Sequence, residues 1–142
     1  MLKNIPKNIS PKLMKILMEM GHSDEIVLAD GNYPAASNAR NLVRLDGESM
    51  PDVLRAILEF FPLDTYVEAA FSLMATEPID NFIPKIWHEY EEVLNASTAE
   101  NKTIEKLERM AFYERGKKAF AIVATGEEEI YANIILRKGV VI

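Results

Sequence analysis

The 142-residue sequence contains no cysteine, and this absence removes several kinds of chemistry together. Disulfide bonds, thiolate metal ligands and cysteine nucleophiles are all excluded. Only two histidines are present, His22 and His88, so a histidine-rich metal site is excluded as well. The lack of cysteine suits a reducing compartment, and we therefore expect the protein in the cytoplasm.

Long apolar runs and an excess of positive charge are also missing. No segment approaches the roughly 18 uninterrupted apolar residues that a membrane-spanning helix needs. Polar residues and Pro6 interrupt the first residues before the apolar run of a secretion signal develops. The formal net charge of −6 provides no basic groove for phosphates and no attraction to anionic lipid. We therefore expect neither a nucleic-acid partner nor a membrane partner.

Several motifs of common enzyme classes are absent too. The chain has no GxGxxG or GxxxxGK[ST] segment, which argues against a nucleotide-binding enzyme. It also has no HExxH and no GxSxG segment, which argues against a zinc hydrolase and an α/β-hydrolase.

What remains is the composition of an ordinary globular protein. Hydrophobic residues make up 49% of the chain and charged residues 27%. The length fits one domain with a substantial core, so we expect residues 1–142 to form a single domain.

Helical spacing and end signals predict two helices in the first half of the chain. Ser10 is an N-cap residue in front of a helix over 11–20, and Gly21 is the expected C′ residue. Ser49 caps a second helix, which ends at Pro62.

The other elements follow from short apolar runs and turn residues. Residues 103–118 fit either one helix or a strand followed by a helix. Strands alternating with helices predict an α/β fold, a three-layer α/β/α domain with a mostly parallel (mixed) central sheet. The remaining expected elements are strands at 25–30, 42–45, most of 66–75, 120–124 and 134–136, a loop at 31–41 and a helix around 86–94.

His22 and Asp30 are the candidate functional residues that the local pattern indicates. His22 lies just past the first helix, where the helix dipole favours imidazolium, and a histidine titrating near neutrality can transfer protons. Asp30 follows a buried strand, and ligands of such sheets gather at the carboxyl ends of strands. The simpler interpretations are a histidine that bonds the last helical carbonyls and an aspartate that opens a turn. If the strand runs away from the helix, the two residues lie at its opposite ends.

Other charged groups are better explained as solvated surface. His88 lies one helical turn from Glu91 and Glu92. The run Glu127-Glu128-Glu129 is expected to be a solvated turn. The residues alone therefore predict a globular α/β domain with a polar site, and no substrate.

Three blocks of the chain resemble the L-fucose mutarotase / D-ribose pyranase family over nearly its full length. They are the Gly-His-x-Asp-Glu start followed by Asp30, an arginine-aromatic block and the ending Tyr-Ala-Asn-Ile-x-Leu-x-x-Gly-Val. In this sequence they span 20–30, 109–115 and 131–140, and the segments 62–68 and 118–127 are similar to the fucose branch.

The resemblance implies a cofactor-free, metal-free isomerase that interconverts the ring forms of a free monosaccharide. It implies that His22 is the proton donor, that Asp30 and Arg109 bind substrate, and that Tyr131, Ala132 and Asn133 form a sugar-binding segment. It also implies a strand at 103–108, a helix at 111–118 and a ring-shaped homo-oligomer, commonly a decamer, with sites at or near subunit contacts. His22 and Asp30 would then meet through the fold or through a neighbouring subunit.

The resemblance leaves three functions to compare. Arg109 and the Phe-Tyr-Glu-Arg block favour the fucose branch, and the expected substrate is L-fucose, interconverted between its anomers. Ala132 stands where the fucose branch usually has glycine, which is a feature of the ribose branch and could narrow the approach of the backbone to the sugar. A D-ribose pyranase and a non-catalytic sugar-binding accessory protein are the alternatives.

Overall fold

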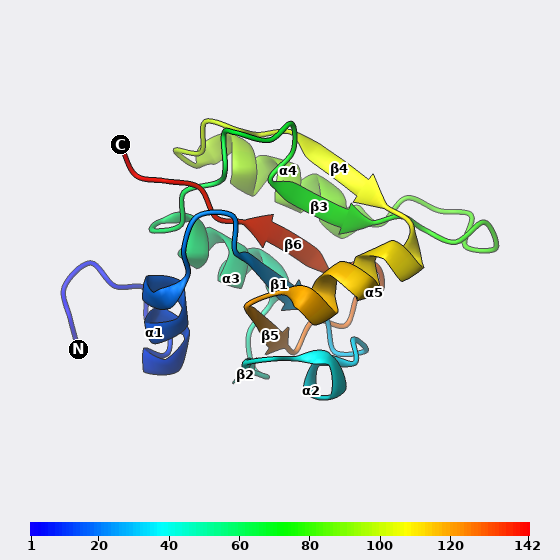
Figure 1. The fold of residues 1–142 in the computed structure, drawn as a ribbon. Helices are drawn as coiled ribbons and strands as arrows, with labels where there is room; N and C mark the ends of the chain where they lie inside the picture. Colours follow the sequence, from blue (N-terminus) through cyan, green and yellow to red (C-terminus); the bar gives the residue numbers. More distant parts are fainter.

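A six-stranded sheet with the order β2-β5-β1-β6-β3-β4 forms the middle layer of the protein (Figure 1). The computed structural model describes all residues, 1–142. Strand β6 runs antiparallel to its neighbours β1 and β3, and the other pairs are parallel. The strands are β1 (Glu25–Ala29), β2 (Leu42–Leu45), β3 (Phe71–Met74), β4 (Ile104–Leu107), β5 (Ala121–Thr125) and β6 (Ile134–Arg137).

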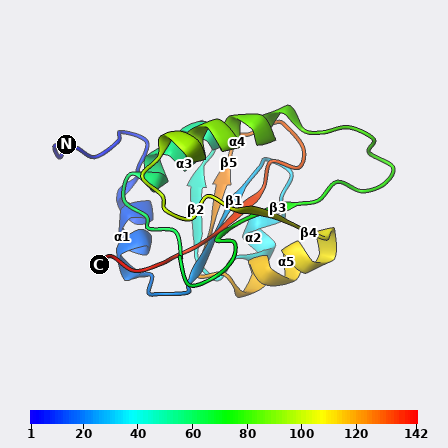
Figure 2. The ribbon, with the colours of Figure 1, turned by 90° about the horizontal axis from the view of Figure 1, so that it is seen from above.

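Helices cover both faces of this sheet (Figure 2). The helices are α1 (Pro11–Glu19), α2 (Ala35–Asn38), α3 (Met50–Leu58), α4 (Lys85–Ala96) and α5 (Arg109–Lys118). Helices α3 and α4 lie together on one face, and α2 and α5 lie on the other. The expected three-layer α/β/α fold with a mostly parallel, mixed sheet is confirmed. None of the helices has the length and apolar composition that crossing a bilayer requires.

The expected helix starts are formed by side-chain caps. The hydroxyl of Ser10 accepts the N–H of Leu13, and that of Ser49 accepts the N–H of Asp52. The end of α1 differs from expectation, because Gly21 does not adopt a left-handed conformation. Ser23 takes the positive φ instead, at 73°, and its N–H bonds the carbonyl of Lys138.

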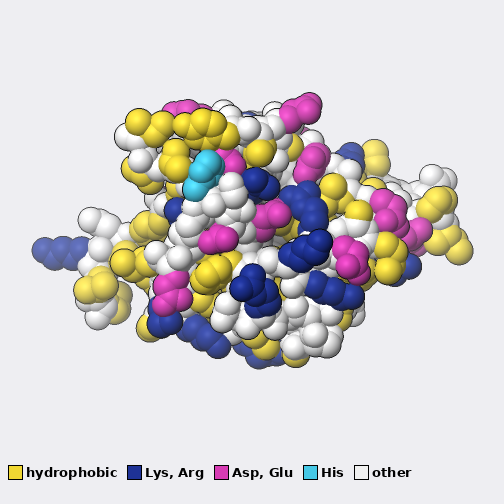
Figure 3. Space-filling view, viewed as in Figure 1, with side chains coloured by type: hydrophobic (Ala, Val, Ile, Leu, Met, Phe, Trp, Pro, Cys, Tyr) yellow, Lys and Arg dark blue, Asp and Glu magenta, His cyan; other side chains and the backbone are white.

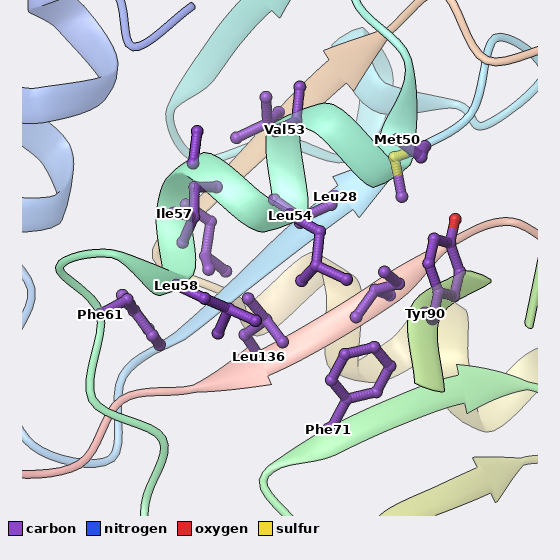
Figure 4. Close-up of a cluster of buried hydrophobic side chains, with 14 of the residues drawn as sticks. Leu28, Met50, Val53, Leu54, Ile57, Leu58, Phe61, Phe71, Tyr90 and Leu136 are labelled. Carbon is purple, nitrogen blue, oxygen red and sulfur yellow. The ribbon is translucent and has the colours of Figure 1, made fainter. Parts of the chain in front are cut away.

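Successive side chains of a strand point to opposite faces of the sheet, so the strands contribute to two separate hydrophobic cores. The larger core joins α1, α3 and α4 to one face of the sheet, and Figure 4 shows side chains of α3 over β1 and β6. The smaller core lies under α2 and α5, where Phe112 and Tyr33 pack edge-to-face. Because only Phe112 and Gly116 of α5 are buried, apolar contact holds this helix weakly.

An ionic network supplements this small core. Arg115 of α5 binds Glu25 of β1 and Glu105 of β4, and the Arg115–Glu105 contact measures 3.0 Å. The hydroxyl of Ser72 in β3 donates to the same Glu105 carboxylate at 2.6 Å. Lys and Arg side chains gather over α5 on this face of the molecule (Figure 3). The network therefore connects α5 to three strands.

Three local expectations need correction or refinement. The 31–41 segment is not entirely loop, since the helix-favouring Ala35-Ala36 pair begins the short α2. Within 66–75 only β3 is extended, because the N–H of Tyr66 bonds the side chain of Asp64 and turns the chain. The ambiguous 103–118 segment is a strand followed by a helix, as the family resemblance implies.

The acidic run 127–129 is not simply a solvated turn. Glu127 accepts the N–H of Met50 at the start of α3, and Glu129 accepts that of Ile86 at the start of α4, both at 3.2 Å. Carboxylates are favoured there because they accept hydrogen bonds from free N–H groups and because their negative charge lies near the positive end of the helix dipole. Only Glu128 fits the expectation of an exposed side chain.

Gly116 brings a prediction about how α5 packs. A β-carbon at this position would collide with the buried hydroxyl of Tyr33, which has no hydrogen-bond partner. We expect Gly116→Ala to lower the free energy of unfolding by about 1–3 kcal/mol through overpacking. Adding Tyr33→Phe should recover most of this loss, because it removes the colliding oxygen. Urea unfolding of the two single variants and the double variant measures this, and strictly additive effects would contradict it.

Candidate functional site

The carboxyl edge of the sheet gathers residues that are far apart in the sequence. Asp30 follows β1 and Asn133 precedes β6, and the antiparallel pairing of Leu28 with Ile134 places them side by side. The Asn133 side-chain oxygen accepts the N–H of Asp30 at 2.8 Å. Open α/β sheets bind ligands outside the carboxyl ends of their strands, and Asp30 lies at such an end.

A cavity of about 230 Å³ opens at this edge. It is smaller than the roughly 300–1,000 Å³ of sites for drug-sized ligands, and its wall combines polar and aromatic side chains. Four of the sequence-predicted residues line it, namely Asp30, Arg109, Tyr131 and Asn133. The rest of the lining comprises Asn32, Tyr33, Met74, Asp80, Tyr113 and Ile130.

Asp30 is a buried acid with a fixed orientation. Its side chain accepts the N–H of Asn32 at 3.0 Å, which is the Asx-turn geometry of the simpler interpretation. Burial raises the pKa of Asp30, although backbone hydrogen bonds from Asn32, Ala132 and Tyr33 oppose this effect. These hydrogen bonds hold the Asp30 carboxyl in one orientation at the cavity.

The segment before β6 is held in an uncommon backbone conformation. Tyr131 has a φ of 61°, the left-handed region that non-glycine residues rarely occupy. Two buried side chains of α4 secure it: Trp87 donates to the carbonyl of Tyr131 at 2.9 Å, and Tyr90 donates to that of Ala132 at 2.6 Å. Strain maintained by such over-determined contacts is typical of binding sites.

Ala132 differs from the other predicted binding residues in where its side chain lies. The residue is completely buried, and its methyl group belongs to the core beneath α4. It does not line the cavity, so the alanine does not narrow the approach of the backbone from that side. The contact of Ala132 with the site runs through its backbone, which hydrogen-bonds Asp30.

Helix α5 contributes Arg109, which the family resemblance indicated, and Tyr113, which sequence reasoning missed. The two lie four residues apart on the same helical face, and the guanidinium carbon is 6.0 Å from the centre of the Tyr113 ring. This spacing within the quoted 109–115 block was the available signal. Asp80 was also missed, since it lies in an irregular segment without a recognisable pattern.

His22 lies at the other end of β1, in a second polar cluster. Its Nε2 atom is 3.2 Å from Oδ1 of Asp64, and its ring contacts that of Tyr66. Asp64 also accepts Nε of Arg137 at 3.2 Å and is 1% exposed, whereas the His22 side chain is 41% exposed. His22 is therefore oriented by a buried acid and remains open on its other side, rather than bonded to the last carbonyls of α1.

Hydrogen bonding outweighs burial at Asp64. Burial alone would raise its pKa, but the N–H of Tyr66, His22 and Arg137 together lower it below the ordinary value. The carboxylate is consequently charged throughout the neutral range.

The fold of one chain does not bring His22 to the cavity. The 5-residue β1 lies between His22 and Asp30, which amounts to roughly 17 Å at about 3.3 Å per residue. The separation anticipated from the sequence is therefore real: within one chain, His22 and Asp30 lie at opposite ends of β1. No cluster of three or more His, Asp or Glu side chains is arranged to hold a metal ion.

Comparison of the chain with known proteins identifies its family. Residues 3–141 match the model of the RbsD / FucU transport protein family. The chain belongs to this family. The resemblance noted from the sequence is thereby confirmed.

Members of the RbsD / FucU family with assigned names are similar over almost the full chain. A fucose mutarotase of Mus musculus is 49% identical, covering 97% of this chain and 94% of its own. The structure of the Streptococcus pneumoniae fucose mutarotase in complex with L-fucose superposes with a TM-score of 0.95 at 56% identity, covering 99% and 100% of the two chains. The Bacillus subtilis RbsD structure with D-ribose gives 0.77 at 25% identity, covering both chains completely.

Asp64 leads to a prediction on acid stability. Its folded pKa lies below the unfolded value of about 3.9, so its stabilising effect is present above that pH. The effect is lost as the pH falls through the folded pKa. We expect Asp64→Asn to lower the free energy of unfolding by about 1–3 kcal/mol at pH 7 and to flatten its decline in acid. Urea unfolding at several pH values tests this, and an unchanged acid limb would argue against it.

Proposed function

We propose that residues 1–142 form a single mutarotase domain that interconverts the α and β anomers of free L-fucose. The observation that carries the proposal is the cavity containing Asp30, Arg109, Tyr131 and Asn133, in a chain 56% identical to a fucose mutarotase solved with L-fucose. The greater similarity to that structure than to RbsD with D-ribose favours fucose over ribose. The proposed activity is that of a cofactor-independent isomerase.

Mutarotation needs proton transfer at two oxygens and little else. An acid protonates the ring oxygen while a base removes the proton of the anomeric hydroxyl, and the bond between the anomeric carbon and the ring oxygen breaks. The free aldehyde rotates, and the ring closes on its other face with the roles exchanged. A positioned acid or base contributes about 10²–10⁴-fold to such a step.

The proposed roles follow the chemistry of each group. His22 is the proton donor, oriented by the charged Asp64. Asp30 and Arg109 hold sugar hydroxyls through charge-assisted hydrogen bonds. Tyr131 offers its ring and hydroxyl, and Asn133 lines the same cavity. Ala132 contributes through its backbone hydrogen bond to Asp30.

The proposal requires that a second copy of the chain supply His22. Exposed apolar side chains at both ends of the strands, near His22 and near the cavity, support such a contact. Tyr66, whose ring contacts His22, is 70% exposed, and Val141, which follows β6, is 86% exposed. Ile79 and Ile83, which follow β3, are 89% and 81% exposed. Joining the His22 end of one copy to the cavity end of the next is a heterologous contact, and such a contact forms a ring when the rotation between successive copies closes. We propose a cytoplasmic ring-shaped homo-oligomer, with a decamer as the expected size.

The central test is saturation-transfer NMR, which measures exchange between the two anomers of L-fucose. The native protein should accelerate this exchange, and His22→Ala should reduce it by about 10²-fold or more. A His88→Ala variant is the matched control, because His88 is an exposed helical residue paired only with Glu91 and Glu92. Full activity of His22→Ala would show that another group donates the proton.

Substrate preference is tested by running the same assay on L-fucose and D-ribose in parallel. We expect faster exchange with L-fucose at equal sugar concentration. Faster exchange between the pyranose and furanose forms of ribose would instead identify a ribose pyranase. Calorimetric binding of sugar without any accelerated exchange would identify a non-catalytic binding protein.

Sharing of the site between subunits makes a separate prediction. His22→Ala and Asp30→Asn chains are each expected to be inactive, but dissociating and reassembling them together should restore activity. With random mixing at 1:1, about a quarter of the heterologous contacts join an intact His22 to an intact cavity. If the mixed assemblies stay as inactive as the separate variants, each site belongs to one chain.

A further inference from the structure

The segment between β3 and α4 extends beyond the carboxyl edge of the sheet (Figures 1 and 2). It runs over 75–84, and its first N–H, that of Ala75, bonds the carbonyl of Leu107 at 2.8 Å. A short turn follows, in which the N–H of Asp80 bonds the carbonyl of Glu77 at 2.9 Å. This turn directs two carboxylates, Glu77 and Asp80, at residues of the candidate sugar site.

Glu77 contacts two site residues that come from different parts of the chain. Its carboxylate accepts Nε of Arg109 at 2.8 Å. Its backbone N–H donates to the hydroxyl oxygen of Tyr131 at 3.1 Å. One residue therefore connects α5 with the segment that precedes β6.

Asp80 completes the environment of the Tyr131 hydroxyl. The hydroxyl donates its hydrogen to Oδ2 of Asp80, and the rings of Tyr131 and Phe82 lie 6.2 Å apart. A tyrosine hydroxyl has one hydrogen and two acceptor lone pairs. Because Asp80 takes the hydrogen and Glu77 one lone pair, Tyr131 retains a single acceptor position.

The contact with Glu77 has a similar effect on Arg109. A guanidinium group carries five N–H donors in a planar fork. Glu77 engages Nε, so the two Nη groups are left for hydroxyls in the cavity that Arg109 lines. The side chain of Arg109 is 46% exposed, and ion pairs at such positions contribute little to folding stability. The pair therefore affects orientation more than stability.

We propose that Glu77 and Asp80 are positioning residues of the sugar site, which aim the Nη donors of Arg109 and fix Tyr131 as a hydrogen-bond acceptor. This inference rests on the proposed function and deepens it. Neither carboxylate transfers a proton in the reaction. Glu77 acts through Arg109 and Tyr131, and Asp80 acts through Tyr131.

Three variants test the role of Glu77. Glu77→Ala removes the acceptor for Arg109, Glu77→Gln retains an acceptor oxygen, and Glu128→Ala removes an exposed carboxylate from the same edge of the sheet. Kinetics of L-fucose anomer exchange should show a KM about tenfold higher for Glu77→Ala, with kcat changed less than about threefold, because the change acts on sugar binding. Glu77→Gln should recover most of this loss, and Glu128→Ala should match the native protein. Thermal unfolding should differ little among the three.

Double variants separate positioning from a general structural effect. If Glu77 acts through Arg109, adding Glu77→Ala to Arg109→Ala should raise KM by less than about twofold more. Likewise, Asp80→Asn should matter in the native background and have little further effect after Tyr131→Phe. Equal KM values for Glu77→Ala and Glu128→Ala, or fully multiplicative effects in the double variants, would overturn the proposal.

A measurement without sugar keeps this inference distinct from the proposed function. The Nε–H resonance of Arg109 in a ¹⁵N–¹H spectrum should shift in Glu77→Ala and stay close to its native position in Glu128→Ala. If the native protein gives no anomer exchange, the proposed function fails, while this resonance still decides whether Glu77 holds Arg109. If exchange is normal and the resonance does not respond to Glu77→Ala, the positioning role fails alone.

Discussion

The antiparallel pairing of β1 with β6 is the constraint on which the rest of the site depends. The two strands lie at the centre of the sheet, buried on both faces, so their register is firmly specified. At one end this pairing places Asp30 beside Asn133, and at the other it brings the His22 turn against the residues that follow β6. The cavity and the oriented histidine thus lie at opposite ends of the paired strands β1 and β6. Within one chain, the length of β1 therefore keeps His22 apart from the cavity.

Most of the fold could be predicted because it depends on sequence patterns that extend over only a few residues. Ser10 and Ser49 are hydroxyl caps that act within their own helices, and the apolar runs at 25–29 and 121–125 are buried on both faces. The errors occurred where a distant or irregular contact decides the conformation. Glu127 satisfies an N–H 77 residues away, and Asp64 bends the chain at Tyr66 where aromatic content favoured a strand. Periodicity has no means of registering such contacts.

The candidate site, too, could be predicted from the sequence only in part. Asp30 was indicated by its place after a strand, whereas Arg109 and the segment at Tyr131 came only from family resemblance. Tyr113 lies one helical turn from Arg109 and could have been found by spacing. The pairing of His22 with Asp64 joins residues 42 positions apart, and that of Asp30 with Asn133 joins residues 103 positions apart. These contacts are set by topology, and only the folded chain reveals them.

The hydrogen bond from Trp87 to the carbonyl of Tyr131 has a practical consequence. Trp87 is the only tryptophan in the chain, and its indole N–H bonds the backbone of the residue with the strained φ. Indole fluorescence depends on the polarity and hydrogen bonding around the ring. When tryptophan is excited selectively over the five tyrosines, the emission of the protein comes from this single indole, which is bonded to the backbone behind the wall of the cavity. Occupancy of that cavity can be followed optically, without a label and without any chemical turnover.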